Sequence, residues 1–276
     1  MNTISKVYTP LILTIQSILG QLSAGGPALL IFWAGRGGGK TSFLRFLRET
    51  YINAHDTTLL GPWDFSSSLP EALGPEILTA VKEAPASNRK LVLLDNLDEL
   101  LRINNSEPFS TFEHRVLQEL IGRGDTLIIA TSRTPLFQWR DYGVRETARS
   151  LHIPPISQAD VAEWAKAQGL DPERAFALSL GHPHVLKWLE ERPDLPLEEI
   201  DRRVAILFLD GLSEKTRQMA EVASLFPAFD LAVLRPPLVS EEDAESFYGE
   251  YIERLEELMQ AGLVAWGGEV GAYRFR

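Results

Sequence analysis

Residues 28–41 decide the fold: they read Ala-Leu-Leu-Ile-Phe-Trp-Ala-Gly-Arg-Gly-Gly-Gly-Lys-Thr. The apolar run Ala28–Trp33 is typical of a strand that is buried on both faces of a parallel sheet. The turn after it fits the spacing of a P-loop, with Ala34 in the place of the first glycine. Glycines let backbone N–H groups turn inward around a phosphate, and the N-terminus of the following helix adds a positive dipole end. We therefore expect a phosphate-binding loop between a strand and a helix.

Two side chains that follow the glycines are expected to contact the nucleotide in addition to the backbone of the loop. Lys40 is expected to reach the β- and γ-phosphates of a nucleotide, and the Thr41 hydroxyl is expected to bind Mg²⁺. A flexible glycine turn beside a chance Lys-Thr pair is the alternative, and the strand–turn–helix context argues against it. The residues expected to bind the nucleotide here are Gly35, Arg36, Gly37, Gly38, Gly39, Lys40, Thr41 and Ser42.

Further apolar runs extend this unit into a sheet. Strands are predicted over residues 57–65, 90–95 and 126–131, and a fifth strand ends at Ile153. Helices are predicted over residues 41–51, 69–83 (interrupted near Gly74-Pro75) and 109–121. Strands that alternate with helices at this spacing indicate an α/β fold with a parallel P-loop sheet covered by helices.

The predicted strands stop at Pro155. Helices follow over residues 157–168, with Ser157 as N-cap, over 172–180, after Gly181-His182-Pro183 and over 197–209. From Ser213 on, helices over 214–225 and 241–261 precede two short strands over 263–266 and 270–275, a pattern that favours a winged helix. We expect three domains: a P-loop core over residues 1–155, a small helical domain over 156–210 and a winged-helix domain over 211–276.

A carboxylate is expected beside the phosphate loop. The apolar run Leu91–Asp95 ends in an acid, which places Asp95 at the carboxyl edge of the sheet, where nucleotides bind. Asp95 is expected to hold Mg²⁺ through water, as Walker-B aspartates do. Asp98 and Glu99 are candidates for orienting the attacking water. Acids also favour the first turn of a helix, so capping and catalysis both remain open for these two residues.

Thr131-Ser132-Arg133 follows another predicted strand. Arginine suits bidentate contact with phosphate, so Arg133 is a candidate for sensing the γ-phosphate; the alternative is an arginine in a surface loop. The expected catalytic residues are Lys40, Asp95, Asp98, Glu99 and Arg133, and the expected metal ligands are Thr41 and Asp95.

Composition and charge exclude several classes of protein. The chain has 276 residues, no cysteine and a formal net charge of −11. The lack of cysteine excludes disulfide frameworks, thiolate metal sites and thiol catalysis. No apolar run approaches the ~18 residues of a membrane-spanning helix. The apolar residues between Leu11 and Leu22 recur at helical spacing, unlike those of a signal peptide. We expect a cytoplasmic chain with no membrane contact.

Together these motifs resemble the STAND class of signal-transducing P-loop ATPases, which includes the NACHT and NB-ARC families. Residues 95–99 are similar to the NACHT Walker B, although Asn96 departs from the small residue usual at that step. Residues 131–133 resemble the sensor-1 segment of the family. A Gly-x-Pro segment in these families packs on the base and ribose, so the resemblance assigns Gly181 and Pro183 to nucleotide binding. It also implies ATP, ADP and Mg²⁺ as ligands, slow ATP hydrolysis, and a switch that self-associates or engages protein partners.

The resemblance continues to the end of the chain with one departure. STAND proteins have a winged-helix histidine that contacts the diphosphate, and Arg276 stands at about that place. Either Arg276 replaces the histidine or the motif lies beyond this sequence. No effector domain precedes the P-loop and no sensor repeats follow the winged helix in this sequence. We therefore expect a bare nucleotide-switch core, which is either a piece of a longer protein or a protein whose sensor and effector are separate chains.

Two other functions remain open. An AAA+-like ATPase acting in DNA replication or DNA handling also joins a P-loop core to a winged helix. DNA is not an expected partner, because residues 201–276 carry 8 basic and 14 acidic residues, eight of the acids in the helix predicted over 241–261. The other possibility is a module that binds nucleotide with negligible turnover, since geometry at Glu99 and Arg133 decides the rate.

Overall fold

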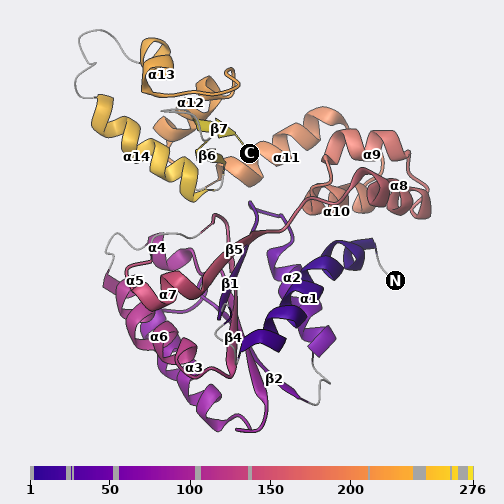
Figure 1. Ribbon diagram of the computed structural model, residues 1–276. Helices are drawn as coiled ribbons and strands as arrows, with labels where there is room; N and C mark the ends of the chain where they lie inside the picture. The colour runs from indigo at the N-terminus through magenta and orange to yellow at the C-terminus, as the bar shows by residue number, and fades with distance from the viewer. Residues whose placement is uncertain are drawn as a thin grey trace. The chain divides into compact units, whose positions relative to one another are not determined.

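The computed structural model describes residues 3–22, 26, 28–51, 56–102, 107–135, 139–210, 212–238, 247–261, 263–266 and 273–275. They divide into two compact units, Met1–Leu195 and Pro196–Arg276 (Figure 1). The first unit contains the parallel sheet, its covering helices and the helices up to residue 191. The helix predicted over 197–209 belongs to the second unit. The three predicted domains remain a proposal beside this division.

A five-stranded parallel sheet forms the centre of the first unit. Its strands are β1 (Leu29–Trp33), β2 (Thr57–Asp64), β3 (Arg89–Asp95), β4 (Thr126–Ser132) and β5 (Ala148–His152), in the spatial order β2-β3-β4-β1-β5. All neighbouring pairs are parallel, which confirms the predicted sheet. Because β4 lies between β1 and β3, the segment after β4 emerges between the phosphate loop and Asp95.

The central strands β3, β4 and β1 contribute alternate side chains to two hydrophobic cores, one on each face of the sheet. Leu30 and Phe32 of β1 face the core under α1 (Thr3–Gln21) and α2 (Lys40–Tyr51). Leu29 and Ile31 face the opposite core, under α3 (Pro70–Glu83), α5 (Glu107–Phe112), η2 (Glu113–Leu117), α6 (Gln118–Ile121) and α7 (Tyr142–Thr147) (Figure 1). Burial on both faces explains why these strands read as continuous apolar runs.

Several helices differ from the prediction. Helix α3 continues through Pro75, so the predicted interruption near Gly74-Pro75 is wrong. The helix predicted over 109–121 contains a five-residue π-helical segment, η2, flanked by α5 and α6. Helix α7 was not predicted: it is six residues long, too short for a periodic apolar face. Its N-cap is Asp141, whose Oδ1 accepts from Val144 N at 3.0 Å.

Three helices follow the sheet within the first unit: α8 (Gln158–Ala167), α9 (Pro172–Ser179) and α10 (Pro183–Glu191). The predicted N-cap is confirmed, because Ser157 Oγ accepts from Asp160 N at 3.2 Å. Helix α8 packs against both α9 and α1, which joins this helical segment to the N-terminal helix. The predicted helical pattern after Pro155 is thus confirmed as far as α10.

The described residues of the second unit form four helices and a strand pair: α11 (Leu197–Leu209), α12 (Glu214–Ala223), α13 (Leu231–Leu238), α14 (Phe247–Gln260), β6 (Val264–Trp266) and β7 (Tyr273–Phe275). Strands β6 and β7 are antiparallel, and Tyr273 also exchanges backbone hydrogen bonds with Phe229 at 2.7 and 2.9 Å. Helices followed by this wing agree with the predicted winged helix, to which the structure adds α13. Residues 241–246, 270–272 and Arg276, which enter the prediction, lie outside the described residues.

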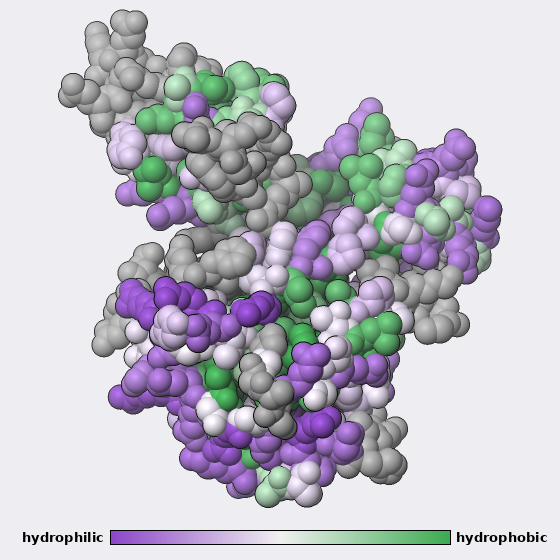
Figure 2. All heavy atoms as spheres, viewed as in Figure 1, coloured by the Kyte–Doolittle hydropathy of each residue, from purple (hydrophilic) through white to green (hydrophobic). Residues whose placement is uncertain are grey.

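Hydrophilic residues dominate the visible surface of the first unit over its outer helices α3 and α6 (Figure 2). None of the helices in the described ranges combines the length and the apolar character that crossing a membrane requires.

Candidate functional site

The phosphate loop occupies residues 34–39, between the end of β1 and the start of α2. Gly37 and Gly39 have φ values of 69° and 89°, in the left-handed region that favours glycine. At Gly38 an added Cβ would lie 2.7 Å from the Ala34 Cβ, so the loop cannot carry a side chain there without moving. These positions explain why the loop needs a run of glycines.

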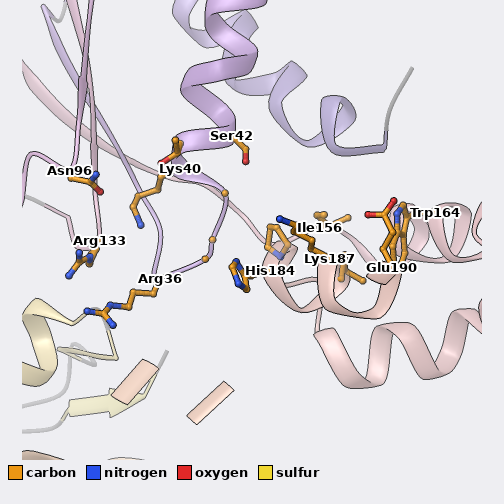
Figure 3. A pocket seen from close by; sticks show the side chains of 16 residues that line it. Arg36, Lys40, Ser42, Asn96, Arg133, Ile156, Trp164, His184, Lys187 and Glu190 are labelled. Carbon is orange, nitrogen blue, oxygen red and sulfur yellow. The ribbon is translucent and has the colours of Figure 1, made fainter. Parts of the chain in front are cut away.

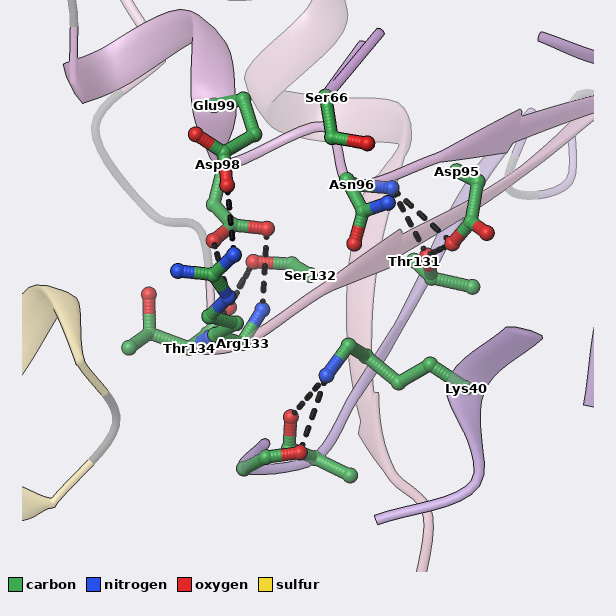
Figure 4. A network of polar contacts seen from close by, with 12 residues as sticks. Lys40, Ser66, Asp95, Asn96, Asp98, Glu99, Thr131, Ser132, Arg133 and Thr134 are labelled. Carbon is green, nitrogen blue, oxygen red and sulfur yellow. Dashed lines mark hydrogen bonds and ion pairs between the residues drawn. The ribbon is translucent and has the colours of Figure 1, made fainter. Parts of the chain in front are cut away.

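Lys40 is buried at the start of α2, with 8% of its surface exposed. Its Nζ donates to the carbonyl oxygens of Ala34 and Gly35 at 2.8 and 3.0 Å (Figure 4). Burial lowers the pKa of Lys40 to about 8, against the opposing charges of Asp98 and Asp95. A partly desolvated cation aimed into a glycine loop is suited to binding a phosphate.

Asp95, at the end of β3, is held from three sides. Thr41 Oγ1 donates to its Oδ2 at 3.0 Å, while Thr131 Oγ1 and Asn96 N both donate to Oδ1, the latter at 3.1 Å. Thr41 and Asp95 thus present adjacent oxygen atoms beside the phosphate loop. Mg²⁺ prefers oxygen ligands, uses few protein groups and completes its shell with water and phosphate oxygens, so this pair fits the predicted metal site.

Arg133 is joined to both of the remaining predicted acids (Figure 4). Its Nη2 donates to Glu99 Oε1 at 2.6 Å, its backbone N donates to Asp98 Oδ1 at 3.1 Å, and its Nε lies 3.8 Å from Asp98 Oδ2. The Arg133 side chain is only 14% exposed. Burial raises the pKa of Asp98, against the charges of Arg133 and Lys40. Asp98 is therefore turned toward Arg133, and Glu99 opens the short helix α4 (Glu99–Arg102) while also pairing with it.

Two polar residues that the sequence did not indicate support this edge. Asn96 has a φ of 56°, a left-handed conformation that asparagine tolerates better than most residues. Its Nδ2 donates to Asp64 Oδ1, at the end of β2, at 2.9 Å. This conformation accounts for an asparagine where the resembling families have a small residue. The position of Asp64 at a strand end was the available signal.

A cavity of about 500 Å³ lies between the phosphate loop and the helices α8 and α10 (Figure 3). The loop side is lined by residues 36–42, with Asn96 and Arg133 beside it. The opposite wall was not predicted except for Pro183; it consists of Ile156, Trp164, Pro183, His184, Leu186, Lys187 and Glu190. An apolar wall with a few polar groups, facing a phosphate loop, suits a ligand with a flat base and a charged tail.

The segment Gly181-His182-Pro183 connects this wall to the phosphate loop. His182 Nε2 lies 2.9 Å from the Arg36 carbonyl oxygen, and burial lowers the pKa of His182. Gly181 has a φ of 78°, and an added Cβ would lie 2.0 Å from the Ile156 carbonyl oxygen. Pro183 lines the cavity, whereas Gly181 is not among its lining residues. The Gly181 backbone is therefore packed directly against Ile156, two residues before α10 begins at Pro183.

The predicted site residues therefore come together in two layers. Those on the cavity wall are Arg36, Gly37, Gly38, Gly39, Lys40, Thr41, Ser42, Arg133 and Pro183. Gly35, Asp95, Asp98 and Glu99 lie behind them and contact them or their backbone, whereas the Gly181 carbonyl oxygen accepts from the backbone N of Ile156.

No family model matches the sequence, and no curated protein matches it significantly. Among solved structures, the Walker-type ATPase of Pyrococcus abyssi is 15% identical with a TM-score of 0.54, over 93% of this chain and 91% of that one.

Two further structures are similar at lower scores. A STAND protein with a tetratricopeptide repeat sensor from Pyrococcus horikoshii is 17% identical with a TM-score of 0.37, over 95% of this chain and 40% of that one. Cdc6p from Pyrobaculum aerophilum is 15% identical with a TM-score of 0.45, over 97% of this chain and 89% of that one. This chain thus spans less than half of the STAND protein. The likeness to the P. abyssi protein shows that the chain has the fold of a P-loop ATPase.

Proposed function

We propose that this chain is a STAND-type molecular switch that binds ATP and ADP with Mg²⁺ and hydrolyses ATP slowly. The cavity carries the proposal: one side is lined by a glycine loop with Lys40, Thr41 and Arg133, with Asp95 bonded behind Thr41, and the other side is lined by Pro183. The resemblance of the motifs to the NACHT and NB-ARC families supports the STAND class.

In this proposal the phosphates lie in the loop and the base lies against α8 and α10. The backbone N–H groups of residues 37–41 and the Lys40 ammonium bind the β- and γ-phosphates. Thr41 and Asp95 would hold Mg²⁺, and the ion would supply positive charge that offsets the charge of the phosphates. The base packs against Pro183 and the apolar side chains of the wall.

The proposed hydrolysis depends on the ion pair between Arg133, just after β4, and Glu99. Arg133 is proposed to contact the γ-phosphate, and Glu99 to orient the attacking water. In the structure the two side chains bind each other at 2.6 Å. We expect this pair to loosen before Glu99 orients a water molecule, and that step would add to the barrier, which supports slow turnover.

A switch needs contacts that differ between nucleotides. Arg133 is placed to report the γ-phosphate, and His182 joins the start of α10 to the backbone of the loop. Exchange of ADP for ATP is proposed to change these contacts and to release surfaces for self-association or for a protein partner in the cytoplasm. Arg276, proposed in place of the locking histidine, lies outside the described residues.

The experiment is to identify the nucleotide that copurifies with the chain and to measure Mg²⁺-ADP binding and ATP turnover. We expect bound ADP, and we expect Lys40→Ala to weaken binding by ~100-fold or more, because it removes a charge-assisted contact inside a buried loop. A purified chain without nucleotide, whose binding and stability do not respond to Lys40→Ala, would falsify the switch.

The competing proposal is an AAA+-like ATPase that handles DNA, the other function compatible with this fold. The described part of α14 carries Glu250, Glu253, Glu256 and Glu257 against Arg254, a poor surface for phosphate contacts. We therefore predict no retention on duplex DNA at low salt. Tight, salt-sensitive retention would favour the DNA-handling function over the signalling switch.

A further inference from the structure

Tyr8 reaches the phosphate loop from the N-terminal helix. It lies on α1, is 2% exposed, and its hydroxyl donates to the Gly39 carbonyl oxygen at 2.9 Å. Its ring packs against Phe43 and Phe46 of α2, with centroid distances of 5.3 and 5.6 Å. The tyrosine is thus fixed at both its ring and its hydroxyl.

The bond from Tyr8 sets the orientation of one peptide group of the loop. The Gly39 carbonyl oxygen also accepts the first hydrogen bond of α2, from Phe43 N at 2.8 Å. Two donors on the same oxygen hold the Gly39–Lys40 peptide plane. In a planar trans peptide the N–H points opposite to the C=O, so the Lys40 N–H points away from Tyr8 and Phe43. That N–H belongs to the run that would cradle a phosphate.

Gly39 is shaped to accept this contact. Its φ of 89° is available to glycine, and an added Cβ would lie 2.6 Å from Tyr8 Oη and 3.6 Å from Pro183 Cγ. The glycine therefore lies between the N-terminal helix on one side and the cavity wall on the other. Burial raises the pKa of Tyr8 to about 12, so the hydroxyl remains a donor at neutral pH.

We propose that Tyr8 is a positioning residue for the nucleotide diphosphate. Its hydroxyl holds the Gly39–Lys40 peptide so that the Lys40 N–H faces the β-phosphate, and it acts through the loop without touching the ligand. This inference rests on the proposed nucleotide-binding function.

The test is Tyr8→Phe in the full chain, with Tyr51→Phe as the matched control. Phenylalanine keeps the ring contacts and removes one donor. Tyr51 is also buried, at 7% exposed, and no hydrogen bond in the described ranges links its hydroxyl to the phosphate loop. The probe is Mg²⁺ with a fluorescent ADP analogue. We expect Tyr8→Phe to raise the Kd about fivefold, mainly through faster dissociation, and Tyr51→Phe to change it less than about twofold.

A second measurement does not depend on nucleotide. In chain labelled with ¹⁵N-lysine, the Lys40 amide resonance is expected to shift in Tyr8→Phe and to stay in place in Tyr51→Phe. A purely structural role would lower the melting temperature of Tyr8→Phe and leave its Kd for the ADP analogue equal to that of the wild type.

The outcomes separate the two proposals. If the wild-type chain binds the ADP analogue but Tyr8→Phe binds it as tightly as Tyr51→Phe does, the positioning role is overturned and nucleotide binding stands. If the wild-type chain does not bind the analogue, the proposed function fails and the positioning role fails with it.

Discussion

Replacing Gly181 with alanine would place a methyl group where the backbone leaves no room. The added Cβ would lie 2.0 Å from the Ile156 carbonyl oxygen, far inside the ~3.5 Å at which such contacts become favourable. Three costs add: about 1–2 kcal/mol for a left-handed conformation, about 1–3 kcal/mol for overpacking, and about 1 kcal/mol if the 2.9 Å bond from Ile156 N to Gly181 O breaks. We expect the free energy of unfolding to fall by about 3–6 kcal/mol.

Gly169→Ala provides the matched control, because it separates the conformational cost from the clash. Gly169 has a φ of 71°, close to the 78° of Gly181, but an added Cβ at Gly169 meets nothing within 4 Å. Only the left-handed strain of about 1–2 kcal/mol remains in that variant. Urea denaturation of both variants and of the wild type, followed by far-ultraviolet circular dichroism, measures the difference directly.

The same comparison has a functional readout. Movement at Gly181 displaces His182 from the Arg36 carbonyl and tilts Pro183, so Gly181→Ala is expected to weaken Mg²⁺-ADP binding by ~10-fold or more, as 1–2 kcal/mol of misplaced contacts would. Gly169→Ala should leave the affinity near that of the wild type. Equal losses of stability in the two variants would refute the argument from the Ile156 contact.

Three further predictions concern the loop and the strand ends. Burial lowers the pKa of Lys40 from 10.5 to about 8, so between pH 8 and pH 10.5 the unfolded chain binds more protons than the folded chain. The wild type should therefore gain stability relative to Lys40→Met as the pH rises from 8 to 10.5. Urea titrations of both proteins without nucleotide measure this change. Thr131→Val removes the hydroxyl that donates to Asp95, and should cost about 1–2 kcal/mol of stability in the same assay and ~10-fold in ATP turnover; unchanged turnover would contradict the role of this bond. Arg133→Ala should lower the rate of phosphate release from ATP by ~100-fold while changing the affinity for ADP less than about threefold. If the hydrolysis rate and the ADP affinity fell by the same factor, Arg133 would not distinguish the γ-phosphate.

The sheet and the phosphate loop could be predicted because their signals are local. A strand buried on both faces is a short apolar run, and a phosphate loop is a run of glycines before Lys-Thr; both can be recognised without knowing the partners. The positions of β1, β3 and β4 follow the prediction within two residues. Asp95 could be placed for the same reason, since parallel strands end at one edge.

The elements that escaped prediction depend on contacts between distant residues. Trp164 reads as one apolar position of a helix, and only the packing of α8 against α9 and α1 brings it to the cavity. Tyr8 reads as a residue near the chain start, and its bond to Gly39 spans 31 positions. The proline at position 75 suggested a break because its effect in isolation is to end a helix, yet α3 continues through it and buries Ile77 and Val81 in the core.

The pairing register of β4 determines both which side chains pack in the two cores and where the Thr131 hydroxyl lies relative to Asp95. Phe32 of β1 lies opposite Thr131, and Leu94 of β3 lies opposite Ala130. A slip of one residue would exchange the β4 side chains between the two hydrophobic cores, which are packed around different side chains, and would also carry the Thr131 hydroxyl away from Asp95. A misregistered chain would thus be unstable as well as inactive, so folding itself excludes conformers with a distorted phosphate edge.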